Sequence, residues 1–201
     1  MNIGKYLRVK SRLFPFKIIY YIYNIVSGNR NRKAYKLDLI KNNILARNYD
    51  VFIETGTYLG DTTWYFKNIF NKIYTIEIEK DLYLAAVKRF KRYKNIKVIN
   101  GDSGQEIRKI IGIIESPSVF WLDAHASGGV TTFRDAFTPI KAEIGAILGD
   151  KRYSHMIFID DVGSFNGKHS YPEIKELKEM VEQTGRYILE PEKRIIIIKP
   201  K

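Results

Sequence analysis

Carboxylates stand at or next to the ends of four short apolar runs in this 201-residue sequence. They are Glu54, Glu77, Asp123 and the neighbouring pair Asp160 and Asp161. Carboxylate oxygens accept hydrogen bonds from hydroxyl groups, bind ammonium groups and coordinate hard metal ions. Because ligands of open parallel sheets bind outside the carboxyl ends of the strands, these acids predict one shared ligand site.

A glycine-containing turn follows the first of these acids, in the segment 53–60 (IETGTYLG). Gly56, Thr57 and Gly60 are candidate cofactor contacts, because glycine lets the backbone pass close to a ligand and the next helix begins with free N–H groups. The segment does not follow the G-x-G-x-x-G pattern of dinucleotide-binding turns, which disfavours a pyrophosphate ligand. Glu54 is a candidate partner for a ligand ammonium group. The alternative is a tight turn that only reverses the chain.

Two further positions have the spacing expected for a nucleoside. Glu77 lies 21 residues beyond Gly56, close to the interval of about 20 residues at which an acid binds ribose hydroxyls. Glu79 competes for this role, because alternation along a strand places both acids on one face. Asp102 and Ser103 follow the third strand and could bind adenine. Capping of the next helix is an alternative that is compatible with this role.

Asp123, Asp160 and Asp161 are candidate metal ligands. Three carboxylates without a thiolate or a histidine pair suit a hard octahedral ion, Mg²⁺ or Mn²⁺. The alternative for the Asp160–Asp161 pair is helix capping, and Asp123 could also orient an acceptor without metal. His125 is a candidate catalytic base, since its ordinary pKa lies near neutrality and it follows Asp123 by two residues. A structural histidine is the alternative.

The elements that must position these residues alternate between apolar runs and amphipathic stretches from residue 49 onward, which predicts an α/β fold with a mostly parallel sheet. The expected strands are 50–55, 72–78, 96–100, 118–123 and 155–160, and the expected helices are 62–70, 82–93, 104–114, 136–148 and 172–184. Residues 186–189 and 194–199 flank 190–193 and predict a closing antiparallel hairpin. Together these elements predict a Rossmann-like, doubly wound, seven-stranded sheet.

The first 48 residues differ from the rest and are expected to form a separate N-terminal arm, with the main domain at 49–201. Residues 1–50 hold 11 Lys and Arg and two acids. The formal net charge of the whole sequence is +12. Residues 13–26 are apolar and aromatic, but too short for a membrane span. We expect a basic linker at 27–33 and a helix at 34–46. Lid, homodimer contact, membrane-surface contact and nucleic-acid binding are the candidate roles.

The sequence contains no cysteine, which excludes disulfides and thiolate metal sites. This composition agrees with a reducing compartment. We therefore expect a cytoplasmic protein, with peripheral contact to a membrane as a further option.

The ordered motifs IETGTYLGDTT, YTIEIEKD, VINGDSGQEI, VFWLDAH and MIFIDDV resemble those of class I S-adenosylmethionine-dependent methyltransferases. The catechol-type metal-dependent and macrocin-type sugar O-methyltransferases are the most similar. The resemblance covers residues 50 to 200. It implies S-adenosylmethionine as cofactor, Mg²⁺ at the acids, and methylation of a small-molecule or glycan hydroxyl. Residues 126–129 depart from the catechol type, which has a lysine in this loop. The alternative is a non-catalytic or RNA-directed protein that uses the basic arm.

Overall fold

The computed structural model describes residues 29–45, 47–123, 138–168 and 170–201. By internal contacts these residues divide into two units, the first holding residues 29–43 and the second holding the described residues from 44 onward. Helix α3 (Asn29–Ile44) belongs almost wholly to the first unit. Its start corrects the predicted linker at 27–33. Residues 29–33 contain no glycine or proline, and Arg and Lys are good helix formers.

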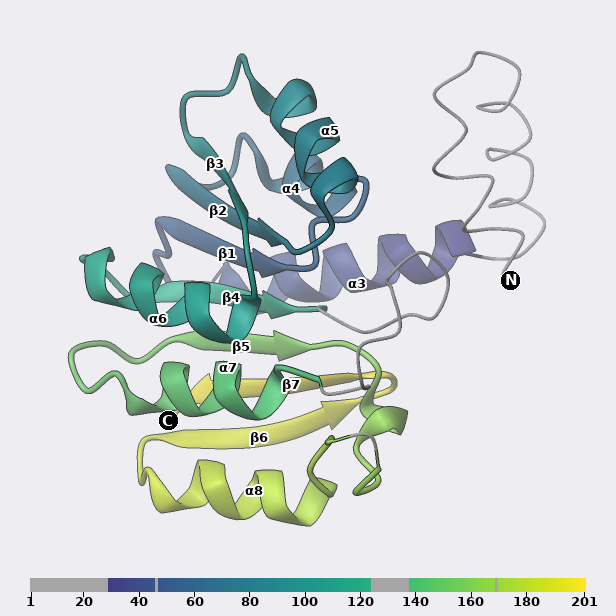
Figure 1. Cartoon of the computed structure of the whole chain (residues 1–201). Helices are drawn as coiled ribbons and strands as arrows, with labels where there is room; N and C mark the ends of the chain where they lie inside the picture. The colour runs from purple at the N-terminus through teal and green to yellow at the C-terminus, as the bar shows by residue number, and fades with distance from the viewer. Residues whose placement is uncertain (1–28, 46, 124–137, 169) are drawn as a thin grey trace. The chain divides into compact units, whose positions relative to one another are not determined.

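The second unit contains a seven-stranded sheet in the order β3-β2-β1-β4-β5-β7-β6 (Figure 1). The strands are β1 (Val51–Thr55), β2 (Lys72–Glu77), β3 (Ile96–Asn100), β4 (Ser118–Leu122), β5 (Met156–Ile159), β6 (Tyr187–Glu192) and β7 (Ile195–Pro200). The first five strands run parallel, and β7 pairs antiparallel with both β5 and β6. The predicted doubly wound sheet with a closing hairpin is confirmed.

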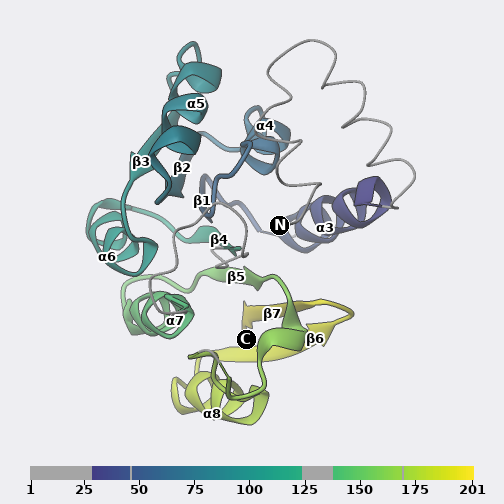
Figure 2. The same ribbon diagram turned by 45° about the vertical axis from the view of Figure 1, so that its right-hand side comes forward.

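The helices of this unit are α4 (Asp61–Phe66), α5 (Lys80–Phe90), α6 (Ser103–Ile113), α7 (Ile140–Gly149) and α8 (Ile174–Gln183), with a 3₁₀ turn η1 (Val162–Ser164). Figures 1 and 2 show α6, α7 and α8 along one face of the sheet. Their buried side chains share one core with the strands, for example Ile107, Ile144 and Leu177 with Phe120. On the other face Phe52 packs against Phe66 and Phe70, with ring centroids 4.8 and 5.1 Å away.

The hairpin turn is shorter than predicted. Strand β6 continues through Glu190 and Pro191 to Glu192, which pairs with Ile195, so only two residues form the turn. Proline is tolerated there because β6 is the edge strand of the sheet and needs no N–H on its open side. Within the described ranges, no helix combines the length and the apolar character that crossing a membrane requires.

A buried polar network lies at the amino ends of β4 and β5. The His155 side chain is fully buried, and its Nδ1 accepts a hydrogen bond from the Ser118 backbone N–H at 3.1 Å. Its hydrogen is therefore assigned to Nε2, which lies 3.4 Å from the Asp150 Oδ2 atom. The Tyr187 hydroxyl accepts the His155 backbone N–H at 2.9 Å. Burial lowers the pKa of His155, although Asp150 acts in the opposite direction. The net lowering favours the neutral imidazole.

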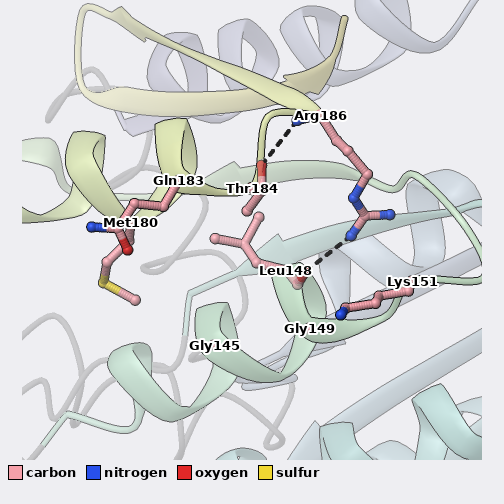
Figure 3. A pocket seen from close by; sticks show the side chains of 8 residues that line it. All are labelled: Gly145, Leu148, Gly149, Lys151, Met180, Gln183, Thr184 and Arg186. Carbon is pink, nitrogen blue, oxygen red and sulfur yellow. Dashed lines mark hydrogen bonds between the residues drawn. The ribbon is translucent and has the colours of Figure 1, made fainter.

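Two arginines complete this end of the sheet. Arg152 donates to Asp150 through its backbone N–H and its guanidinium at 2.9 to 3.0 Å. Arg186 donates to the carbonyl oxygens of Leu148 and Asp150, at 3.0 and 2.8 Å, and so satisfies the free carbonyls at the end of α7. Figure 3 shows the Arg186 contact beside a groove of about 600 Å³ between α7 and α8.

Candidate active site

The turn after β1 is fastened to the neighbouring strand β2. The backbone N–H groups of Gly56 and Thr57 both donate to the Ile76 carbonyl oxygen, at 3.0 and 3.1 Å. Gly56 and Gly60 have φ of 80° and 74°, and Tyr58 between them also has a positive φ of 50°. Left-handed backbone of this kind is costly for residues other than glycine, so the turn stores strain at Tyr58.

Gly60 is required by packing as well as by its backbone. A Cβ atom at this position would lie 2.7 and 2.8 Å from two ring carbons of Phe90 in α5. Arg89, next to Phe90, hydrogen-bonds the Leu59 carbonyl oxygen and also donates to Asp61 Oδ1 at 2.8 Å. The turn is therefore held from two sides, by β2 and by α5.

Threonines surround the carboxylate of Glu54, which is 1% exposed. The hydroxyls of Thr63 and Thr75 both donate to its Oε2 atom, at 2.6 and 2.7 Å. The Thr57 hydroxyl lies 2.5 Å from that of Thr75. Thr57, Thr63 and Thr75 thus belong to one hydrogen-bonded group that fixes a buried carboxyl group beneath the turn. The contact of Glu54 with a ligand ammonium stays a prediction.

Glu77 ends β2 directly beside the turn. Its Oε2 accepts the Tyr58 backbone N–H at 2.7 Å, and its Oε1 accepts the Glu79 backbone N–H at 3.0 Å. Burial raises the pKa of Glu77, while these two hydrogen bonds oppose the rise. A carboxylate has about four lone-pair sites, and the backbone N–H groups of Tyr58, Glu79 and Ile78 do not occupy all of them. Glu79, the competing candidate, lies at the start of α5 and is only half-buried.

Asp102 caps α6, and its Oδ1 accepts the Gln105 backbone N–H at 3.1 Å. Ser103 is the first residue of that helix and is buried. The capping alternative is therefore seen directly, and the adenine contacts of both residues stay predictions. Both lie at the carboxyl end of β3, on the same edge of the sheet as Glu77 and the turn.

The ends of β1, β4 and β5 lie side by side. The Asp123 backbone N–H donates to the Thr55 carbonyl oxygen at 3.2 Å, and that of Asp160 donates to the Leu122 carbonyl oxygen at 3.1 Å. Asp160 is buried, and its Oδ1 accepts the Asp161 backbone N–H at 2.9 Å. These contacts place Asp123 and Asp160 at the carboxyl ends of neighbouring strands, as predicted, on the same edge of the sheet as Glu77 and the turn after β1.

The structure does not support the predicted three-carboxylate metal site. Asp161 has a left-handed backbone with φ of 58°, and its Oδ1 forms an ion pair with Arg194 of the hairpin at 2.8 Å. In the part of the chain that the structure describes, no three His, Cys, Asp or Glu side chains form a group that could hold a metal ion. His125 and the loop 126–129 lie outside the described residues, so the predicted base is not placed.

Two residues near this edge were missed by sequence reasoning. Tyr171 is partly buried, and burial raises the pKa of its phenol. Thr138 opposes that rise by a hydrogen bond, and the negative charges of Asp161, Glu143 and Asp123 add to it. Glu143 in α7 is 1% exposed, although the helix around it is apolar. An acid on the buried stripe of an apolar helix was the available signal. No sequence pattern marked Tyr171, because a loop brings this residue to the edge of the sheet.

Solved structures share this fold, whereas no family model and no curated protein matches the sequence. The O-methyltransferase TomG from Streptomyces achromogenes, in complex with S-adenosylmethionine, aligns with a TM-score of 0.60 and 14% identity over 84% of this chain and 80% of its own. The 23S rRNA methyltransferase ErmE aligns with a TM-score of 0.55 and 13% identity over 83% and 68%. An rRNA methylase from Streptococcus thermophilus aligns with a TM-score of 0.52 and 10% identity over 83% and 94%. The chain has the fold of S-adenosylmethionine-dependent methyltransferases, as the resemblance implied.

Proposed function

We propose that this protein is an S-adenosylmethionine-dependent methyltransferase that acts on a hydroxyl oxygen of a small molecule or glycan. The observation that carries the proposal is the position of Glu77. Its carboxylate is buried and oriented by two backbone N–H groups, at a strand end directly beside a strained glycine turn. A fixed bidentate acceptor at this point suits the two vicinal hydroxyls of a ribose.

Under this proposal, some residues contact the cofactor and others shape or support the turn beside it. Glu77 contacts the ribose, and Asp102 and Ser103 border the adenine. Gly56, Thr57 and Gly60 shape the turn that passes the amino acid portion of the cofactor. Glu54 contributes a negative charge beneath that turn, where Thr63 and Thr75 hold it in place.

The reaction is an in-line displacement. S-adenosylmethionine supplies an electrophilic methyl group on a positively charged sulfur. The acceptor oxygen forms a bond to the methyl carbon while the carbon–sulfur bond breaks, and the bonding electrons stay on sulfur. Asp123, at the end of β4, orients the acceptor hydroxyl. The proton of that hydroxyl passes to Asp123 or to His125. Positioning by the strand ends is the main contribution of the protein.

No step of this reaction is routed through a metal ion, because Asp161 is paired with Arg194. Metal dependence is decided by experiment. Purified protein is assayed for transfer of a labelled methyl group to catechols, sugars, glycans and RNA, with and without a chelator. Activity that is lost in chelator and restored by Mg²⁺ would reinstate the metal site at Asp123 and Asp160.

A direct test of the proposal combines calorimetry with one variant. Wild-type protein is expected to bind S-adenosylmethionine. Asp123→Asn is expected to bind it equally well and to lose about 100-fold in kcat, because the variant removes the acceptor's charged partner. RNA affinity without measurable S-adenosylmethionine binding would overturn the proposal and favour the non-catalytic or RNA-directed alternative. The roles of the arm at residues 1–48 as lid, homodimer contact or membrane contact stay predictions.

A further inference from the structure

A second charged region lies away from the cofactor edge, between the last turn of α5 and the start of β3. Residues 88–97 (KRFKRYKNIK) contain six Lys and Arg and no acid. The rest of residues 51–201 holds 17 Lys and Arg against 20 Asp and Glu. The positive charge of this domain is therefore concentrated in one segment, which a uniform lysine-rich composition does not explain.

Most of these cations are exposed and have no partner among the described residues. The exposed members are Lys88, Lys91, Arg92, Lys94 and Lys97. Within the described residues none of these five forms an ion pair or a side-chain hydrogen bond, whereas Arg89 is engaged by Asp61. Five uncompensated positive charges on one short stretch repel one another. An anionic partner that neutralises them therefore stabilises the segment.

The same segment lines a groove of about 300 Å³ between α5 and β3. Tyr83 and Tyr93 contribute aromatic rings, Val87 and Ile96 contribute apolar surface, and Lys91 and Lys97 are also among the lining residues. Strand β3 is an edge strand that pairs only with β2 (Figure 1), and the groove involves its first three residues, Ile96 to Val98. The groove therefore lies at the amino end of β3, and Phe90 in its lining also contacts the position of Gly60.

We propose that this α5–β3 groove binds single-stranded RNA. Proteins that bind single strands combine a positively charged groove along the backbone with aromatic rings on which bases stack. Duplex DNA keeps its bases stacked inside, whereas RNA exposes unpaired bases in loops and ends. An anionic bilayer is flat, so a protein that binds it would present a broad apolar face. A groove that contains two tyrosines instead suits a narrow chain. The inference goes beyond the proposed methyl transfer and does not depend on the acceptor.

The test measures binding of a short fluorescein-labelled oligouridylate to the full chain by fluorescence polarisation over a range of salt concentrations. The triple variant Lys91→Gln, Lys94→Gln and Lys97→Gln is expected to lose about tenfold in affinity. The slope of log affinity against log salt is expected to fall by about 2, since each phosphate contact on a single strand contributes about 0.7. Tyr83→Leu, which keeps apolar bulk and removes a stacking face, is expected to lose about fivefold.

The matched control is Lys109→Gln, Lys175→Gln and Lys178→Gln. It removes the same charge from exposed lysines of α6 and α8, and it is expected to bind RNA like the wild type. Equal RNA affinity of the two triple variants would overturn the inference. It would also be overturned if the groove variant lost binding to phosphatidylserine vesicles while keeping RNA affinity. Calorimetry with S-adenosylmethionine on the groove variant verifies its fold, and a failure of methyl transfer leaves the RNA result intact.

Discussion

The two ends of the parallel sheet both carry buried acids, yet the acids have different surroundings. At the amino ends, Asp150 is held by Arg152 and faces His155, so it balances charges within the protein. At the carboxyl ends, Glu54 accepts hydrogen bonds from the Thr63 and Thr75 hydroxyls, and Glu77 accepts them from the backbone N–H groups of Tyr58 and Glu79. Neutral donors orient the Glu77 carboxylate without cancelling its charge, which suits it to a ligand site.

This difference separates a structural network from a candidate binding site. The amino-end network connects α7, β4, β5 and β6 and should determine stability. The carboxyl-end acids should determine affinity for a positively charged cofactor. Variants at the two ends are therefore expected to change different quantities, and the following predictions are ordered by the size of the expected effect.

Glu77→Ala is expected to weaken S-adenosylmethionine binding by about 100-fold or more, because two hydrogen bonds to a charged acceptor contribute about 1.5–3 kcal/mol each. Calorimetry measures the affinity, and circular dichroism verifies the fold. Glu79→Ala is the matched control and should bind normally. If Glu79→Ala loses binding and Glu77→Ala does not, the ribose contact belongs to the competing residue.

Gly60→Ala is expected to destabilise the protein by about 2–3 kcal/mol, since a left-handed non-glycine residue costs about 1–2 kcal/mol and the Phe90 ring must also move. Thermal unfolding measures the change. Gly112→Ala is the control, because no atom lies within 4 Å of a Cβ atom at that helical position. That variant should be neutral or slightly stabilising. Equal effects of the two substitutions would show that Phe90 packing does not constrain the turn.

Asp150→Asn is expected to lower stability by about 2 kcal/mol, or roughly 4–8 °C in Tm, because a charged acceptor of several hydrogen bonds is lost. Affinity for S-adenosylmethionine should stay unchanged. A large loss of cofactor affinity with no change in Tm would contradict the division between the two ends of the sheet.

The smallest effect expected is a pH dependence of stability from His155. Burial lowers its pKa in the folded protein, so below the unfolded value of about 6.5 the unfolded chain binds a proton that the folded chain does not. Stability from this residue is thus present above about pH 6.5 and declines as the pH falls, by at most about 1.4 kcal/mol per pH unit. Tm values from pH 7.5 to 5.5 should show a shallower slope for His155→Gln than for wild type.

Much of the fold was predictable, because continuous apolar runs such as 118–123 mark strands covered on both faces. The positions of Asp123 and Asp160 followed from the same rule. The ion pair of Asp161 with Arg194 was not predictable, since the hairpin brings together residues 33 positions apart. The helix at Asn29 and the short turn after Glu192 were missed because local composition alone was weighed. The roles assigned to individual site residues stay predictions.

Phe90 has a consequence that joins the two proposed sites. Its ring contacts the position of Gly60 in the turn after β1 and is also part of the lining of the α5–β3 groove. A ligand in the groove that displaces this ring changes the free energy of the turn, and a cofactor that tightens the turn changes the groove. Thermodynamic linkage makes such coupling reciprocal, so each ligand alters the affinity for the other by the same factor. A single aromatic ring thus gives this small domain a route to cooperativity.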